Sequence, residues 1–208
     1  MRKTLIPHAM RNVGQPELRN QEVIDYKVWT LAVGFGNWSD TGNWNNNTKP
    51  SGGSNVLFGP YQGFCIINED TPILSGFRVR NDYTSTISSN KVISLSGYFT
   101  YYSDGNFSTN RSIINAKSGD VRFDGDGRVF WDYSVWNLSG GFNQKTLDTP
   151  VDNFSTINML GSGKTVYSED ELNRLSIIGS TYGSGNLVIE GLLKISGEFS
   201  IPSGTEVI

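Results

Sequence analysis

Short apolar runs recur along the chain from about residue 55 onward, and turn-forming residues separate them. Several runs alternate apolar and polar positions, as in Val121–Phe123, Leu175–Ile177 and Leu193–Ile195. The residues between the runs are mostly Gly, Asn, Asp and Ser. Short alternating runs bounded by such residues predict β-strands of three to five residues. The pattern therefore predicts an all-β chain with many turns.

The dipeptide Ser-Gly supplies a longer period. It occurs nine times, with its glycine at positions 52, 76, 97, 119, 140, 163, 185, 197 and 204. When Gly197 is left aside, the glycines follow one another by 19 to 24 residues, with a mean near 22. Two or three short strands in each 22-residue step match one coil of a parallel β-helix. A single coil cannot bury its inward side chains, whereas stacked coils form a continuous core.

We therefore predict a parallel β-helix of about seven coils over residues 37–208. We expect its last coil to continue beyond residue 208 or to be covered by another subunit, because Leu193, Ile195, Phe199 and Ile201 would otherwise be open to solvent. The glycines at 76, 97, 119, 140 and 163 should stack along one edge.

A capping-box pattern at Ser168–Glu171, followed by two leucines at helical spacing, predicts a short helical turn. The alternative fold is a β-sandwich or jelly roll, which explains short strands but not the 22-residue step.

Residues 1–36 differ from the rest. This segment carries five basic and three acidic residues, two prolines and no clean hydrophobic period. It nevertheless contains several large apolar side chains, which a free tail seldom carries. We therefore predict an extended N-terminal arm that docks on a partner, with these candidate docking residues: Tyr26, Trp29, Leu31 and Phe35.

Composition narrows the function classes. Gly, Ser and Asn make up 68 of 208 residues and Ala only three, which disfavours helices. The net charge of −3 gives no basic footprint for nucleic acid. The single Cys65 excludes an internal disulfide and a multi-cysteine zinc site, and the single His8 excludes a histidine-rich metal site. The sequence contains no run of 18 apolar residues, so no segment is predicted to span a membrane. We expect no metal and no cofactor.

One stretch carries a family resemblance. Gly36-Asn-Trp38-Ser-Asp40-Thr-Gly-Asn43-Trp44 is followed by Pro50-Ser-Gly-Gly and by the run Asn55–Phe58. This stretch resembles the first module of β-helical surface proteins of phages and bacteria, and the later Gly-rich segments are similar to the repeats of that group. The resemblance implies a right-handed β-helix and a role at a virion or cell surface. It identifies no catalytic residue, and the tryptophan pair is equally well explained as a hydrophobic lid over the first coil.

The middle coils are rich in aromatic residues, which bind sugars by stacking when they are exposed. The candidate carbohydrate contacts are Tyr101, Tyr102, Trp131 and Trp136. Because alternate strand residues point inward, about half of such aromatics are expected in the core instead. No pair of carboxylates is singled out as catalytic. We therefore expect no enzymatic activity, while a polysaccharide hydrolase or lyase stays open.

These observations favour a structural protein of a phage virion, such as a tail fibre, spike or decoration component, assembled in the host cytoplasm. Its expected partners are other virion proteins, bound through the N-terminal arm, and further copies of itself, with a trimer favoured. A host surface glycan is a further candidate partner. The alternatives are a bacterial surface adhesin or autotransporter passenger, and a tailspike that binds or degrades polysaccharide for host attachment.

Overall fold

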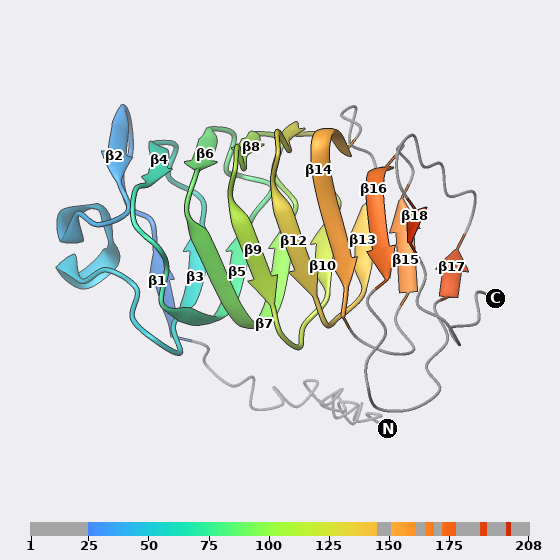
Figure 1. Cartoon of the computed structure of the whole chain (residues 1–208). Helices are drawn as coiled ribbons and strands as arrows, with labels where there is room; N and C mark the ends of the chain where they lie inside the picture. The colour runs from blue at the N-terminus through green and yellow to red at the C-terminus, as the bar shows by residue number, and fades with distance from the viewer. Residues whose placement is uncertain are drawn as a thin grey trace, which may run out of the picture.

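The computed structural model describes residues 25–144, 151–160, 165–168, 172–177, 188–190 and 199–200. Its strands are parallel and stack as a β-solenoid of about four complete turns (Figure 1). The predicted β-helix is confirmed, although about seven coils were expected. The sandwich alternative is wrong, since sandwich sheets are built from antiparallel strands. No α-helix occurs among the described residues.

Each complete turn has three sides, and the strands of each side pair along the rod. The first side contains β1 (Tyr26–Val28), β3 (Asn55–Phe58), the second halves of β5 (Ile73–Val79) and β7 (Val92–Tyr101), β10 (Val121–Phe123), β13 (Phe142–Gln144), β15 (Thr165–Ser168) and β17 (Val188–Glu190). The second side contains β2 (Phe35–Asn37), β4 (Phe64–Ile67), β6 (Thr86–Ser89), β8 (Asn106–Ser108) and β11 (Val129–Phe130). The third side contains the first halves of β5 and β7, then β9 (Ile113–Ala116), β12 (Val135–Leu138), β14 (Val151–Met159), β16 (Leu172–Ile177) and β18 (Phe199–Ser200).

The strand register reproduces the period of the sequence. On the first side, one inward column runs through Val56, Phe77, Phe99, Val121 and Phe142, each 21 or 22 residues after the one before. Parallel strands lie about 4.8 Å apart, so equivalent residues of successive turns contact one another. A column is therefore the unit of packing in this fold.

The Ser-Gly dipeptides mark the corner between the third side and the first side of the next turn. An added Cβ at Gly140 would lie 2.0 Å from the carbonyl oxygen of Gly119, and one at Gly119 would lie 2.3 Å from the carbonyl carbon of Gly97. The predicted glycine stack is thus confirmed for these three residues, and close backbone approach is its cause. Ser75, not Gly76, continues the stack, because the register shifts by one residue between β5 and β7. Gly163 lies outside the described residues.

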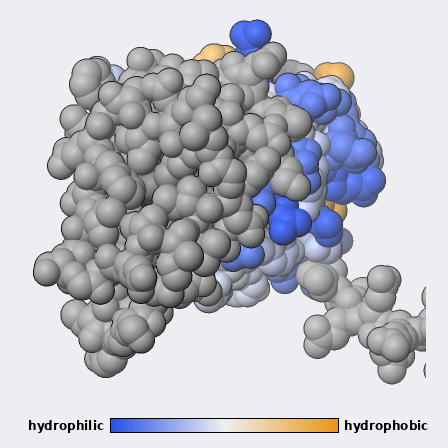
Figure 2. Space-filling view, turned by 90° about the vertical axis from the view of Figure 1, so that its right-hand side faces the viewer, coloured by the Kyte–Doolittle hydropathy of each residue, from blue (hydrophilic) through white to orange (hydrophobic). Residues whose placement is uncertain are grey.

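The core is aromatic along much of its length. Phe77 and Phe99 stack with ring centroids 5.2 Å apart and an interplanar angle of 14°. Phe107 of the second side and Trp136 of the third side meet Phe99 at 5.6 Å each. Each large aromatic buries roughly 150–250 Å². Where Figure 2 shows described residues, the outer surface is mainly hydrophilic, so the apolar residues are largely enclosed.

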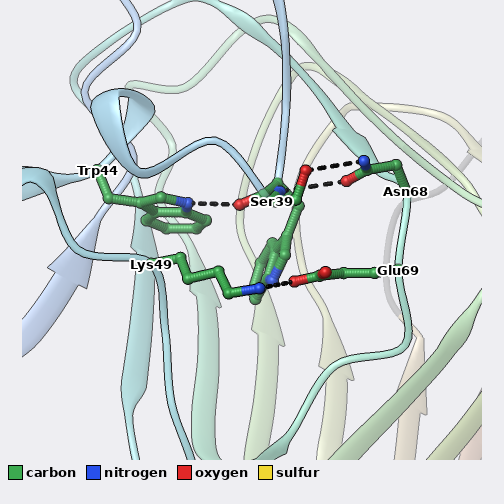
Figure 3. Close-up of polar contacts among 6 residues, drawn as sticks. Ser39, Trp44, Lys49, Asn68 and Glu69 are labelled. Carbon is green, nitrogen blue, oxygen red and sulfur yellow. Dashed lines mark hydrogen bonds and ion pairs between the residues drawn. The ribbon is translucent and has the colours of Figure 1, made fainter.

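Three tryptophans seal the N-terminal end of the rod. Trp29, Trp38 and Trp44 are at most 1% exposed, and the ring of Trp44 lies 5.2 Å from that of Trp29 and 4.7 Å from that of Trp38. The indole nitrogen of Trp44 donates to the carbonyl oxygen of Trp38 at 2.8 Å (Figure 3). This lid also includes two 3-10 helices, η1 (Thr41–Asn43) and η2 (Asn45–Asn47). The interpretation of the tryptophan pair as a hydrophobic lid is confirmed.

Two polar contacts fasten the lid to the first complete turn. The amide of Asn68 accepts from the backbone nitrogen of Ser39 at 3.1 Å and donates to the hydroxyl oxygen of Ser39 at 2.9 Å (Figure 3). The ammonium group of Lys49 lies 2.5 Å from the carboxylate of Glu69. Because this ion pair is partly exposed, it contributes at most about 1 kcal/mol. The lid is therefore held mainly by its buried tryptophans.

Asparagine side chains occupy the open edges of the first strands. The amide of Asn45 accepts from the backbone nitrogen of Val28 at 2.9 Å and donates to the carbonyl oxygen of Tyr26 at 3.0 Å, as a neighbouring strand would. The amide of Asn43 donates to the carbonyl oxygen of Asn37, at the end of β2, at 3.0 Å. A bare edge strand invites pairing with another chain. These amides satisfy the edge within the chain.

The expected boundary of the arm at residue 36 lies too late. β1 pairs with β3, and β2 pairs with β4, so both belong to the solenoid. The predicted helical turn near residues 168–175 is also corrected, because Leu172 and Leu175 lie in strand β16. Residues 1–24 lie outside the described part, as do the side chains named for the last coil, Leu193, Ile195, Phe199 and Ile201.

We expect Gly119→Ala to lower the free energy of unfolding by about 1–3 kcal/mol, because the new methyl group would overlap the backbone of Gly97. The matched control is Gly52→Ala, which also alters a Ser-Gly dipeptide but has no atom within 4 Å of the added carbon. Urea denaturation measures both. Equal midpoints for the two variants would contradict the stacking explanation.

We expect Asn45→Ala to increase self-association relative to the wild type, because it frees the backbone groups of β1 that the amide now satisfies. The loss of two hydrogen bonds should also lower stability by about 1–2 kcal/mol. Sedimentation velocity over a range of concentrations measures the association. Asn110→Ala, at an exposed turn, is the control, and identical sedimentation of the two variants would refute the edge-blocking role.

Candidate functional site

A groove of about 620 Å³ opens on the outer surface of the first side, where its strands reach the corner toward the second side. The volume lies in the range of small-ligand sites. The residues that line it come from successive turns: Tyr26, Leu57, Arg78, Arg80, Asn81, Tyr102 and Asp124.

Two outward columns place these side chains. The first runs through Leu57, Arg78, Thr100 and Arg122, which are register partners on β3, β5, β7 and β10. Each of them alternates with an inward residue of its strand. Because the strands are parallel and in register, the four side chains emerge on the same face at intervals of about 4.8 Å.

The second column lies just beyond the strand ends and contains Arg80, Tyr102 and Asp124. Their backbone nitrogens donate to carbonyl oxygens of the neighbouring turn or strand at 3.0, 2.9 and 2.9 Å, with Phe58, Val79 and Tyr101 as the acceptors. These bonds continue the ladder past the strands. The groove is therefore built on the rigid part of the rod.

The charges in the groove are unequally neutralised. The guanidinium group of Arg80 lies 2.7 Å from the carboxylate of Asp82. Arg78 has no ion pair among the described residues, and its guanidinium carbon lies 6.0 Å from the ring centroid of Tyr102. Asp124 is exposed at the far end of the second column. The groove thus offers one unneutralised cation beside an aromatic ring, with a carboxylate farther along the rod.

Tyrosines border the groove at its N-terminal end. The hydroxyl groups of Tyr26 and Tyr98 lie 3.2 Å apart, and the Tyr98 ring lies over Gly76, where a Cβ would be 2.4 Å from it. Burial is the main cause that raises the pKa of Tyr98 above its ordinary value, and the hydrogen bond with Tyr26 adds to the rise. The Tyr98 hydroxyl therefore stays protonated at physiological pH and acts as a neutral hydrogen-bonding group.

Of the four candidate carbohydrate contacts, the structure places only Tyr102 in the groove. Tyr101, Trp131 and Trp136 are fully buried and cannot contact a sugar. Tyr101 directs its ring inward because it alternates with Tyr102, and its hydroxyl donates to the carbonyl oxygen of Gly105 at 2.7 Å. The rings of Trp131 and Trp136 pack against each other, 5.1 Å apart, in the core.

The four candidate docking residues of the arm are also separated. Tyr26 borders the groove, Trp29 belongs to the lid, and Leu31 packs against the core. Phe35 alone is largely exposed, at 76%. Among these four residues, Phe35 is the one that presents a large apolar surface to a partner.

The sequence interpretation missed Arg78 and Arg80. Their signal lies in the period: positions 78, 100 and 122, and positions 80, 102 and 124, are each 22 residues apart. Aligning outward positions by that step would have brought Arg78 and Arg80 beside Tyr102.

A second hollow, of about 260 Å³, lies on the third side and is chemically different. Asn115 and Asn137 line it and form a ladder with Asn158: the Asn137 amide donates to the side-chain oxygen of Asn115, and the Asn158 amide donates to that of Asn137, both at 2.8 Å. Because these amides bond to one another, they stabilise the stack and leave fewer free donors for a ligand. The groove on the first side is the stronger candidate.

Comparisons with known proteins add no relative: no family model, no curated protein and no solved structure matches the chain. In the described part, no three His, Cys, Asp or Glu side chains gather in a group that could hold a metal ion. Among those same residues, no helix has the length and apolar character needed to cross a membrane.

Alkaline pH tests the burial of Tyr101. Burial raises its pKa, so the folded chain keeps the proton at a pH where the unfolded chain, with a tyrosine pKa of about 10, loses it. Its contribution to stability is therefore intact below about pH 10 and declines as the pH rises further. We expect the stability advantage of the wild type over Tyr101→Phe, measured by urea denaturation between pH 8 and 11, to shrink with pH. If the stability difference between the wild type and Tyr101→Phe stayed constant with pH, the burial of the Tyr101 hydroxyl would be contradicted.

Proposed function

We propose that the chain is a structural component of a phage virion, such as a fibre, spike or decoration component, that docks by its N-terminal region and presents a β-helical rod. The observation that carries the proposal is the solenoid with one sealed end. Its strands pair along the rod through backbone hydrogen bonds, and its core is continuous over the turns. Such a rod holds its shape without a partner along its sides.

An exposed apolar patch at the sealed end supports docking there. Val33 is 80% exposed and Phe35 is 76% exposed, and no other large hydrophobic side chain in the described part exceeds these values. Phe35 lies on β2, the terminal strand of the second side. Surface patches of this kind commonly mark contacts between proteins. The patch suits attachment to other virion proteins or to further copies of the chain.

A second candidate function is host attachment through a glycan, as in a tailspike. The groove with Arg78 and Tyr102 favours this function, since it combines an aromatic face with hydrogen-bonding groups. The two functions are compatible, because the groove lies on the side of the rod and the apolar patch at its end. A bacterial surface adhesin with the same rod is the competing assignment.

Immunogold electron microscopy of the source organism and its phage particles tests the location. We expect the label on assembled particles; label confined to the bacterial cell surface would favour the adhesin instead.

Phe35→Ser then tests docking, because it removes the apolar contact without changing the charge. We expect this variant to lose incorporation into particles or assembly into a homo-oligomer, measured by co-sedimentation and sedimentation velocity. The control is Phe130→Ser, a phenylalanine on the same side that is 41% exposed and lies several turns away. Equal loss in both variants would contradict docking at the sealed end.

A further inference from the structure

Arg78 and Arg122 are exposed on the first side. Neither arginine has an ion pair among the residues that the structure describes. They belong to the same outward column, with Thr100 between them. Their Cα atoms are therefore two strand spacings apart, about 10 Å. This distance is close to the length of two hexose rings in an extended oligosaccharide.

The neighbouring column supplies an aromatic face and hydrogen-bonding groups. Tyr102 lies beside Thr100 on the same turn, and the guanidinium group of Arg78 approaches its ring. Asn81 and Asp124 line the same groove. An aromatic face packs against the C–H face of a sugar ring, while amide and carboxylate groups bind hydroxyls. Nucleic acid is disfavoured by the net charge of −3.

We propose that this groove, extended along its outward column to the adjoining Arg122, binds an oligosaccharide that carries a carboxylate on alternate sugar rings. One carboxylate binds Arg78, the next binds Arg122, and the ring between them lies on Tyr102. A guanidinium group matches a carboxylate through two parallel hydrogen bonds, which makes arginine selective for this acid.

Asp124 sets the orientation of the chain. Its carboxylate repels the acidic groups of the ligand, so these groups face the arginine column and the hydroxyl edge faces Asp124 and Asn81. Arg80 takes no part in binding the acid, because Asp82 already neutralises it. The proposal does not depend on a virion role, since the same groove would bind this ligand on any surface protein.

Isothermal titration calorimetry tests the proposal with a matched pair of ligands. The first is a hexasaccharide of alternating glucuronate and N-acetylglucosamine, and the second is the same hexasaccharide with its carboxyl groups reduced to alcohols. We expect the acidic form to bind the full chain at least about tenfold more tightly, the size expected for one charge-assisted contact. Failure of the acidic form to bind at millimolar concentration, or equal affinity of both forms, overturns the proposal.

Variants then locate the site. Arg78→Gln and Arg122→Gln should each weaken binding of the acidic form by about tenfold. Tyr102→Leu should weaken both forms alike, because it removes the ring face and not the acid contact. The control is Arg128→Gln, which makes the same change of charge at an exposed position just before β11 on the second side. If Arg128→Gln weakened binding of the acidic form equally, the effect would come from overall charge, and binding in the groove would be refuted. Circular dichroism verifies that every variant retains the solenoid.

Discussion

The in-register stacking of parallel turns is the constraint on which the rest of the structure depends. Each turn places its residues about 4.8 Å from the same positions of the next turn, so every column repeats one environment. Phe77 and Phe99 stack because both lie on the same inward column. Gly97, Gly119 and Gly140 follow one another at a corner where the backbones leave no room for a Cβ. The amides of Asn115 and Asn137 bond to each other on an outward column for the same reason.

A stack of turns must also end, and the N-terminal lid shows how this chain solves that problem. The register from β1 to β3 spans 29 residues and not 22, because the segment with η1 and η2 is inserted in the first turn. Trp44 covers the apolar interior, while Asn45 satisfies the backbone edge of β1. Trp44 and Asn45 thus prevent association in two different ways. Trp44 covers apolar area that would otherwise be exposed, and Asn45 pairs backbone groups that would otherwise be free at the strand edge.

Stacking also determines where chemistry can occur on the surface. Outward columns in a solenoid present their side chains at a fixed spacing on a rigid face, so a ligand with its own repeat can be matched by the period of the protein. The column with Arg78 and Arg122 is of this kind, and the adjacent column with Tyr102 adds an aromatic face. The Asn ladder has the same geometry, but its donors are directed along the column. The groove differs because the long side chains of its columns reach solvent.

The sequence by itself determined the class of fold and the period, because Ser-Gly recurs at the corners and short apolar runs fill the sides. It also identified the segment that closes the N-terminal end, since Trp38 and Trp44 precede the first strand of a complete turn. Taken alone, the two adjacent residues Tyr101 and Tyr102 carry no mark of which one faces inward. That choice depends on the register of β7 against β5 and β10, which the stacked turns establish. The groove likewise exists only in the tertiary structure, because residues one and two turns apart in sequence become neighbours when the coils close upon one another.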